Sequence, residues 1–176
     1  MKTLRFLLLT VFITTLVACS KDDDNTPPSS SIVGSWTLES GGIESTTITM
    51  EGLDFPIQVS GSFINISDTN RITFKEDNTF TSVTGNIILR MEMVVFGMPQ
   101  TQDVEINDFL GEGTWEIAND KLIINNDNGT TIPYQIVSFT ETDLVLKANT
   151  SDIDSGTGAG VPGGLDIEVI MNLKRV

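Results

Sequence analysis

Apolar and polar residues alternate along most of the chain from Ile32 onward. The alternation is clearest in four segments, residues 32–38, 71–75, 132–136 and 167–173. Because successive side chains of a strand point to opposite faces, a period of two predicts half-buried β-strands. No apolar stripe with helical spacing extends beyond two turns. The pattern therefore predicts an all-β domain over residues 32–176.

Turn-forming residues separate the predicted strands at short intervals, as in Asp77-Asn78, residues 127–129 and residues 141–143. Short connections favour antiparallel neighbours, and closure into a barrel removes the exposed edges of a sheet. We expect an antiparallel up-and-down β-barrel of about 8–10 strands. The last predicted strand runs to the end of the sequence, so no helix is expected after the barrel.

The first nineteen residues have the pattern of an export signal. Lys2 and Arg5 precede an uncharged run of twelve residues, 6–17. That run is too short to span a bilayer, which needs about 20 residues, but it suits a secretory signal peptide. The run ends Leu16-Val17-Ala18-Cys19, which resembles the lipobox of bacterial lipoproteins and contains the only Cys of the chain. The resemblance implies that residues 1–18 are removed and that Cys19 is acylated; the alternative is a buried free thiol.

Residues 19–31 then form a predicted tether. The segment 20–24, Ser-Lys-Asp-Asp-Asp, resembles the acidic tag that sends lipoproteins of some Gram-negative bacteria to the cell surface. This likeness implies an outer-membrane lipoprotein exposed at the surface, with the periplasmic face of that membrane as the alternative. The Pro and Ser residues that follow are typical of a solvated linker.

Composition excludes several classes of function. The absence of His removes Ser-His-Asp catalysis and His-ligated metal sites, and a single Cys removes Cys-cluster metal sites. The 24 acidic and 10 basic residues give a charge of −14, which disfavours binding to nucleic acid and to anionic lipid headgroups. We expect no cofactor, no metal and no nucleic-acid partner, and membrane contact only through the lipid on Cys19.

A family resemblance is carried by Gly34-Ser35-Trp36, which resembles the Gly-x-Trp signature of lipocalins. The segments 72–80, 113–117, 121–124 and 140–147 follow in the order seen in the small lipocalin-like domain of many bacterial lipoproteins. The resemblance implies a barrel that holds a small hydrophobic or amphipathic ligand. Two departures are the lack of a helix after the barrel and the lack of a second recognisable lipocalin motif.

The resemblance also implies that a cation from the end of the chain stacks on Trp36. Arg175 shares the face of the apolar residues of the last strand, so Arg175 is expected over the indole instead of Lys174. Gly34 would leave room for that side chain to cross. Together with Trp115, these residues are interpreted as structural groups that close the barrel.

Two predicted hairpins, residues 47–60 and 87–106, have apolar tips where loops are normally polar. The candidate residues for a ligand or partner surface are Met50, Leu53, Phe55, Met91, Met93, Phe96 and Met98. One interpretation is a flexible apolar mouth for a ligand or partner, since Met suits irregular surfaces. The other is that the tips fold over and complete a small core.

Three functions remain open. The preferred one is a lipid-anchored binding protein with a cavity at the hairpin end, lined by residues such as Met50, Met91, Met93 and Phe96. The second is a cell-surface structural or interaction module with a filled core, which contacts a protein or glycan through the tips. The third, a hydrolase, needs two carboxyl groups across a cleft, one with a raised pKa, and is disfavoured. Asp152 and the glycine-rich residues after it are interpreted as a loop and not a calcium site.

Overall fold

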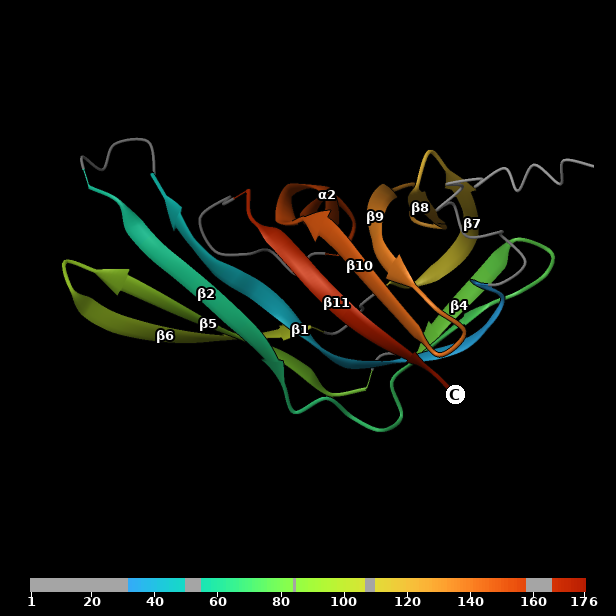
Figure 1. Ribbon diagram of the computed structural model, residues 1–176, viewed down its shortest axis with the longest axis horizontal. Coiled ribbons are helices and arrows are strands. Elements are labelled where there is room, and N and C mark those ends of the chain that lie inside the picture. Colours follow the sequence, from blue (N-terminus) through green and yellow to red (C-terminus); the bar gives the residue numbers. More distant parts are fainter. Residues whose placement is uncertain (1–31, 50–54, 84, 107–109, 158–165) are drawn as a thin grey trace, which may run out of the picture.

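The computed structural model describes residues 32–49, 55–83, 85–106, 110–157 and 166–176 (Figure 1). Cys19, the signal segment, the tether, Met50 and Leu53 lie outside these residues. The described elements are β1 (Gly34–Ile48), β2 (Ile57–Ile64), β3 (Arg71–Phe74), β4 (Thr79–Val83), β5 (Ile87–Val95), β6 (Met98–Ile106), β7 (Glu112–Ala118), β8 (Lys121–Asn126), β9 (Thr131–Phe139), β10 (Asp143–Asn149), α2 (Thr150–Thr157) and β11 (Glu168–Arg175).

Eight of these strands close into an antiparallel barrel, which confirms the predicted all-β, lipocalin-like class. Around the barrel the order is β1, β3, β4, β7, β8, β9, β10 and β11. Closure comes from pairing between β11 and the first part of β1, where Trp36 lies opposite Arg175 and Leu38 opposite Leu173. The interior is packed with side chains that are at most 2% exposed, including Phe74, Phe80, Trp115, Leu122, Ile124 and Leu146.

The other three strands form a projection that we call the arm (β2, β5 and β6). The second part of β1 pairs with β2, so that Ile48 lies opposite Ile57. β2 pairs with β5, and β5 pairs with β6 along its full length. Figure 1 shows the arm extending away from the barrel. Among the described strands β6 pairs only with β5, so the prediction that closure removes every edge is wrong for this strand.

Gly41 and Gly42 allow β1 to pair with strands of both the barrel and the arm. A Cβ atom on Gly41 would lie 2.2 Å from the carbonyl oxygen of Ile170 in β11. A Cβ atom on Gly42 would lie 2.1 Å from the carbonyl oxygen of Gly61 in β2. Both glycines have positive φ values, 158° and 147°. The two neighbouring strands therefore approach β1 more closely than any side chain would permit.

The end of the barrel that contains Trp36 is closed by aromatic and cationic groups. The guanidinium carbon of Arg175 lies 4.2 Å from the centroid of the Trp36 ring, as the sequence led us to expect. Arg175 also donates through Nη1 to the carbonyl of Val33 at 2.7 Å and through Nε to that of Glu141 at 2.6 Å. A Cβ atom on Gly34 would lie 2.5 Å from Arg175 Nη1, so the glycine makes the required space.

The helix α2 replaces the loop predicted around Asp152. Its sequence has weak helix propensity, but Ile153 packs against the core and the helix contacts β9 and β10, so tertiary packing outweighs the local preference. Thr150 fixes its start, since its Oγ1 accepts from the Ile167 amide at 3.0 Å and its own amide donates to the Ile167 carbonyl at 2.8 Å. No helix in the described part of the chain is long and apolar enough to cross a bilayer.

Candidate functional site

The direction of the strands divides the barrel into a closed end and a mouth end. The closed end carries Trp36, Arg175 and the turns at residues 75–78 and 140–142. Because β1 runs away from this end, its last residues and the arm lie at the opposite, mouth end, together with α2. Phe55 and the β5–β6 turn, which come from the apolar tips of the two predicted hairpins, belong to this end as well.

The inner face of the arm continues the apolar core of the barrel. Directly paired residues of antiparallel strands share a face. Val59 of β2 lies opposite Met93 of β5, and Phe63 lies opposite Leu89. We call this surface the inner wall, and it consists of Ile48, Ile57, Val59, Phe63, Leu89, Met91, Met93 and Val95.

Two candidates from the sequence, Met91 and Met93, belong to the inner wall. Met91 is 1% exposed and Met93 is half-buried and packed against the core. β6 adds Gln102 opposite Met91 and Gln100 opposite Met93, so the wall has two amide groups in the middle of its outer strand, whereas Val104 opposite Leu89 keeps it apolar nearer the barrel. An apolar surface bordered by a few amide groups is the usual composition of a small-molecule site.

The tip of the arm contains Phe55 and Phe96, whose ring centroids lie 4.1 Å apart. Phe55 is half-buried, whereas Phe96 is 71% exposed and Met98 is 60% exposed. Phe96 occupies the β5–β6 turn with a φ of 52°, at the hairpin tip that the sequence pattern indicates, so its side chain lies at the rim of the inner wall. The tip is thus partly folded onto itself and partly an exposed apolar surface.

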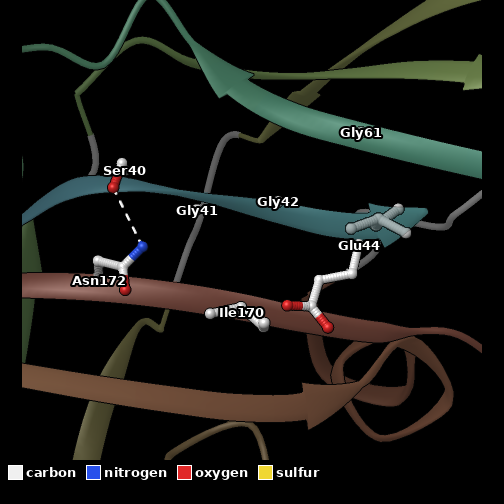
Figure 2. Close-up of a pocket in the computed structure, with 8 residues that line it drawn as sticks. Ser40, Gly41, Gly42, Glu44, Gly61, Ile170 and Asn172 are labelled. Atoms are coloured by element: carbon white, nitrogen blue, oxygen red, sulfur yellow. Dashed lines mark hydrogen bonds between the residues drawn. The ribbon is translucent and has the colours of Figure 1, made fainter.

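A groove of about 510 Å³ lies on the opposite, outer face of the sheet, where the arm leaves the barrel (Figure 2). Its floor is the backbone of Gly41, Gly42 and Gly61. Figure 2 shows Glu44 of β1 beside Ile170 of β11, and Asn172 Nδ2 donates to Ser40 Oγ at 3.1 Å. The groove is open, and polar and apolar groups contribute about equally to its lining.

Within the described part of the chain, two buried polar side-chain atoms have no hydrogen-bond partner, Ser82 Oγ in β4 and Asn126 Oδ1 in β8. Ser82 lies opposite Ile72, and Asn126 continues the buried alternation of Leu122 and Ile124, so both face the barrel interior. Neither residue stands out in the sequence as a candidate for binding. The alternation in residues 122–126 was the available signal, because it places an amide on an otherwise apolar face.

The family model for a lipocalin-like domain matches residues 32–146 of the chain. The chain belongs to the lipocalin-like domain family. The match begins two residues before β1 and ends within β10, so it covers six of the eight barrel strands in full, part of β10 and the whole arm.

Solved structures similar to this lipocalin-like domain include two of bovine odorant binding protein. The deswapped triple mutant is 12% identical, with a TM-score of 0.32 over 83% of this chain and 74% of the other. The complex with a selenium-containing odorant is 13% identical, with a TM-score of 0.34 over 89% and 78%. No curated protein sequence matches the chain. With TM-scores this low, the family assignment rests on the domain match.

Hydrogen bonds stabilise the charged form of three carboxyl groups in the lipocalin-like domain. The pKa values of Asp77, Asp103 and Asp143 all lie below their usual range. The causes are hydrogen bonds, first from Thr79 to Asp77, from Arg90 to Asp103 and from Thr142 to Asp143. These three carboxyl groups are therefore ionised near neutral pH, which does not suit a general acid.

The described residues also contain no group of three or more His, Cys, Asp or Glu side chains arranged to bind a metal ion. Burial of the Tyr134 phenol raises its pKa, and the negative charge of Asp152, in the first turn of α2, raises it further. Burial is the larger of the two causes.

Proposed function

We propose that this lipocalin-like domain binds a small hydrophobic or amphipathic molecule at the mouth end of its barrel. The observation that carries the proposal is the inner wall, an apolar face that extends the core beyond the closed part of the barrel and stays only half-buried at Ile48, Met93 and Val95. Lipocalin-like folds typically bind small hydrophobic ligands, which agrees with this surface. The fold alone does not define the ligand, so the wall is the basis of the proposal.

We further propose that the domain is anchored to a membrane through acylated Cys19 and displayed on the surface of a Gram-negative outer membrane. The support is the lipobox-like sequence before Cys19 and the acidic segment 20–24. Labelling with an alkyne fatty acid should modify the wild-type chain and not Cys19→Ser. Protease added to intact cells should cleave the protein at the surface, and replacing Asp22, Asp23 and Asp24 with Ala should protect it if the segment acts as the export tag.

A second candidate function is an interaction module that acts through the arm. It is favoured by the exposed side chains of Phe96 and Met98 and by β6, whose residues 98–103 are all exposed. An exposed edge strand presents backbone groups that can pair with another chain. This candidate requires a protein or glycan partner and no small ligand.

Binding of an apolar probe separates the two candidates. The chain from Ser20 contains every residue that the structure describes, and it can be studied by native mass spectrometry and by uptake of the dye N-phenyl-1-naphthylamine. We expect the mass spectrum to show a lipid-like adduct that solvent extracts from the protein. We also expect the fluorescence of the dye to rise when it binds. A bare mass without dye uptake would contradict ligand binding and favour the interaction module.

Adjacent residues of β5 supply a matched pair of variants. Met93→Trp places an indole on the inner wall, and Glu92→Trp places the same group on the outer face, because Glu92 is exposed and lies opposite Ser60. We expect Met93→Trp to weaken dye binding about tenfold or more through steric exclusion. Met91→Trp should also weaken dye binding, at a more deeply buried position of the inner wall. Glu92→Trp should bind as the wild type does, and equal effects of both variants would locate the dye elsewhere.

A further inference from the structure

We propose that Ser82 and Asn126 form a polar subsite for the hydroxylated, uncharged head group of an amphipathic ligand. This inference rests on the proposed function and specifies the chemical class of its ligand. Its basis is the pair of buried polar atoms, Ser82 Oγ and Asn126 Oδ1, that lack a partner and face the interior. Buried polar groups are normally hydrogen-bonded, so two unpaired atoms on one inner surface indicate a missing partner.

The orientation of the Asn126 amide follows from its neighbours. Thr130 Oγ1 donates its proton to Asn128 Oδ1 at 2.6 Å. The same hydroxyl can then only accept from Asn126, so the group facing it at 3.2 Å is Nδ2. Asn126, which is 8% exposed, therefore directs its acceptor Oδ1 away from Thr130, and the missing partner must be a donor.

Between the two residues lies Gly113 of β7, where a Cβ atom would be 2.1 Å from the Asn125 carbonyl oxygen, so β7 and β8 approach closely at this point. Phe80 of β4 lies opposite Gly113 of β7, and Gly113 lies opposite Asn126 of β8. Ser82 is two residues beyond Phe80 on the same face, and its amide donates to the Gly111 carbonyl at 2.9 Å. Strands are about 4.8 Å apart and rise about 3.3 Å per residue, so two strand spacings and the two-residue offset separate the Cα atoms of Ser82 and Asn126 by roughly 12 Å, which suits a head group with more than one hydroxyl.

Charge favours a neutral head group over a carboxylate. Arg90, Lys147 and Lys174 form ion pairs with Asp103, Glu168 and Asp143 on the outside of the sheet. Arg175 is held over Trp36 at the closed end, and the side chains of Arg71, Lys75 and Lys121 are exposed. No cation of the described residues thus faces Ser82 or Asn126, and an anionic head would be buried without a counter-charge.

Competition between matched lipids tests the inference. Monoolein, methyl oleate and oleate share one acyl chain but differ in the head, and each can displace N-phenyl-1-naphthylamine from the chain that begins at Ser20. We expect monoolein to bind about fivefold or more tightly than methyl oleate, because a hydrogen bond to a buried polar group contributes about this much to affinity. Ser82→Ala and Asn126→Leu should each reduce that preference. The control Thr81→Val removes a hydroxyl from the other face of β4 and should leave the preference unchanged.

The outcomes separate this inference from the proposed function. Equal binding of monoolein and methyl oleate would overturn the polar subsite and leave apolar binding intact. Tightest binding of oleate would overturn the requirement for an uncharged head. Displacement by none of the three, together with no dye uptake, would overturn both proposals. If Asn126→Leu does not fold, Ser82→Ala still decides the question, because it removes only one oxygen atom.

Discussion

The side chain of Asn70 replaces a neighbouring strand for the backbone of Leu38. Asn70 Oδ1 accepts from the Leu38 amide at 2.7 Å, and Nδ2 donates to the Leu38 carbonyl at 3.4 Å and to that of Ser67 at 2.6 Å. β1 pairs with β3 only up to Trp36 and with β2 only from Gly42, so Leu38 lies in the gap between them. The buried amide supplies the hydrogen bonds that a strand would otherwise make.

We expect Asn70→Ala to lower the free energy of unfolding by about 2–3 kcal/mol, because it leaves the buried Leu38 amide without a partner. Urea denaturation followed by Trp fluorescence measures the change. Asn86→Ala, at an exposed position of the same region, should have little effect. A loss of less than about 0.5 kcal/mol in Asn70→Ala would mean that water replaces the amide.

Arg175→Ala should destabilise the domain by about 2–3 kcal/mol, since it removes a cation–π contact and two hydrogen bonds to carbonyl groups. Arg175→Lys should recover only part of this loss, because an ammonium group cannot reproduce the planar guanidinium. Lys174→Ala, which removes an exposed ion pair on the other face, is the control and should have a smaller effect. A Lys174 effect equal to that of Arg175 would contradict the assigned role.

Gly42→Ala should lower the free energy of unfolding by more than about 3 kcal/mol, since the new Cβ would collide with the Gly61 carbonyl. Gly97→Ala provides the comparison, because Gly97 also has positive φ, 78°, but has no atom within 4 Å of its Cβ position. The cost there should be about 1 kcal/mol from backbone conformation alone. Thermal unfolding of both variants checks the difference.

Tyr134 is the only tyrosine, so absorbance at alkaline pH reports on it without interference. Burial, with a smaller contribution from Asp152, raises its pKa well above the ordinary 10.0. Because the folded state keeps the phenol protonated, this group stabilises the fold below pH 10.0, and that contribution is lost as the pH rises further. We expect phenolate absorbance to appear only together with loss of the folded circular-dichroism signal. Titration near pH 10 in folded protein would show that the ring is accessible.

Some of these features could be predicted from the sequence. The alternation in residues 167–173 places Arg175 on the inner face, and the structure has it over Trp36. The glycine-rich composition after Asp152 predicted a loop, whereas α2 forms because Ile153 packs against the core. The sequence pattern places Phe96 at a hairpin tip, and it does lie in the β5–β6 turn, but its contact with Phe55 depends on how β2 and β5 pair.

The sequence by itself determined the all-β class, the strand alternation and the groups that close one end, because each depends on local period or on residues of fixed type. The tertiary structure decided that β2, β5 and β6 leave the barrel, that Asn70 fills the gap beside Leu38, and that Ser82 and Asn126 face inward without partners. These features depend on strand register and on contacts between residues far apart in the chain. The alternation of apolar and polar residues fixes which side of a strand is buried, but it does not fix which strand lies beside it.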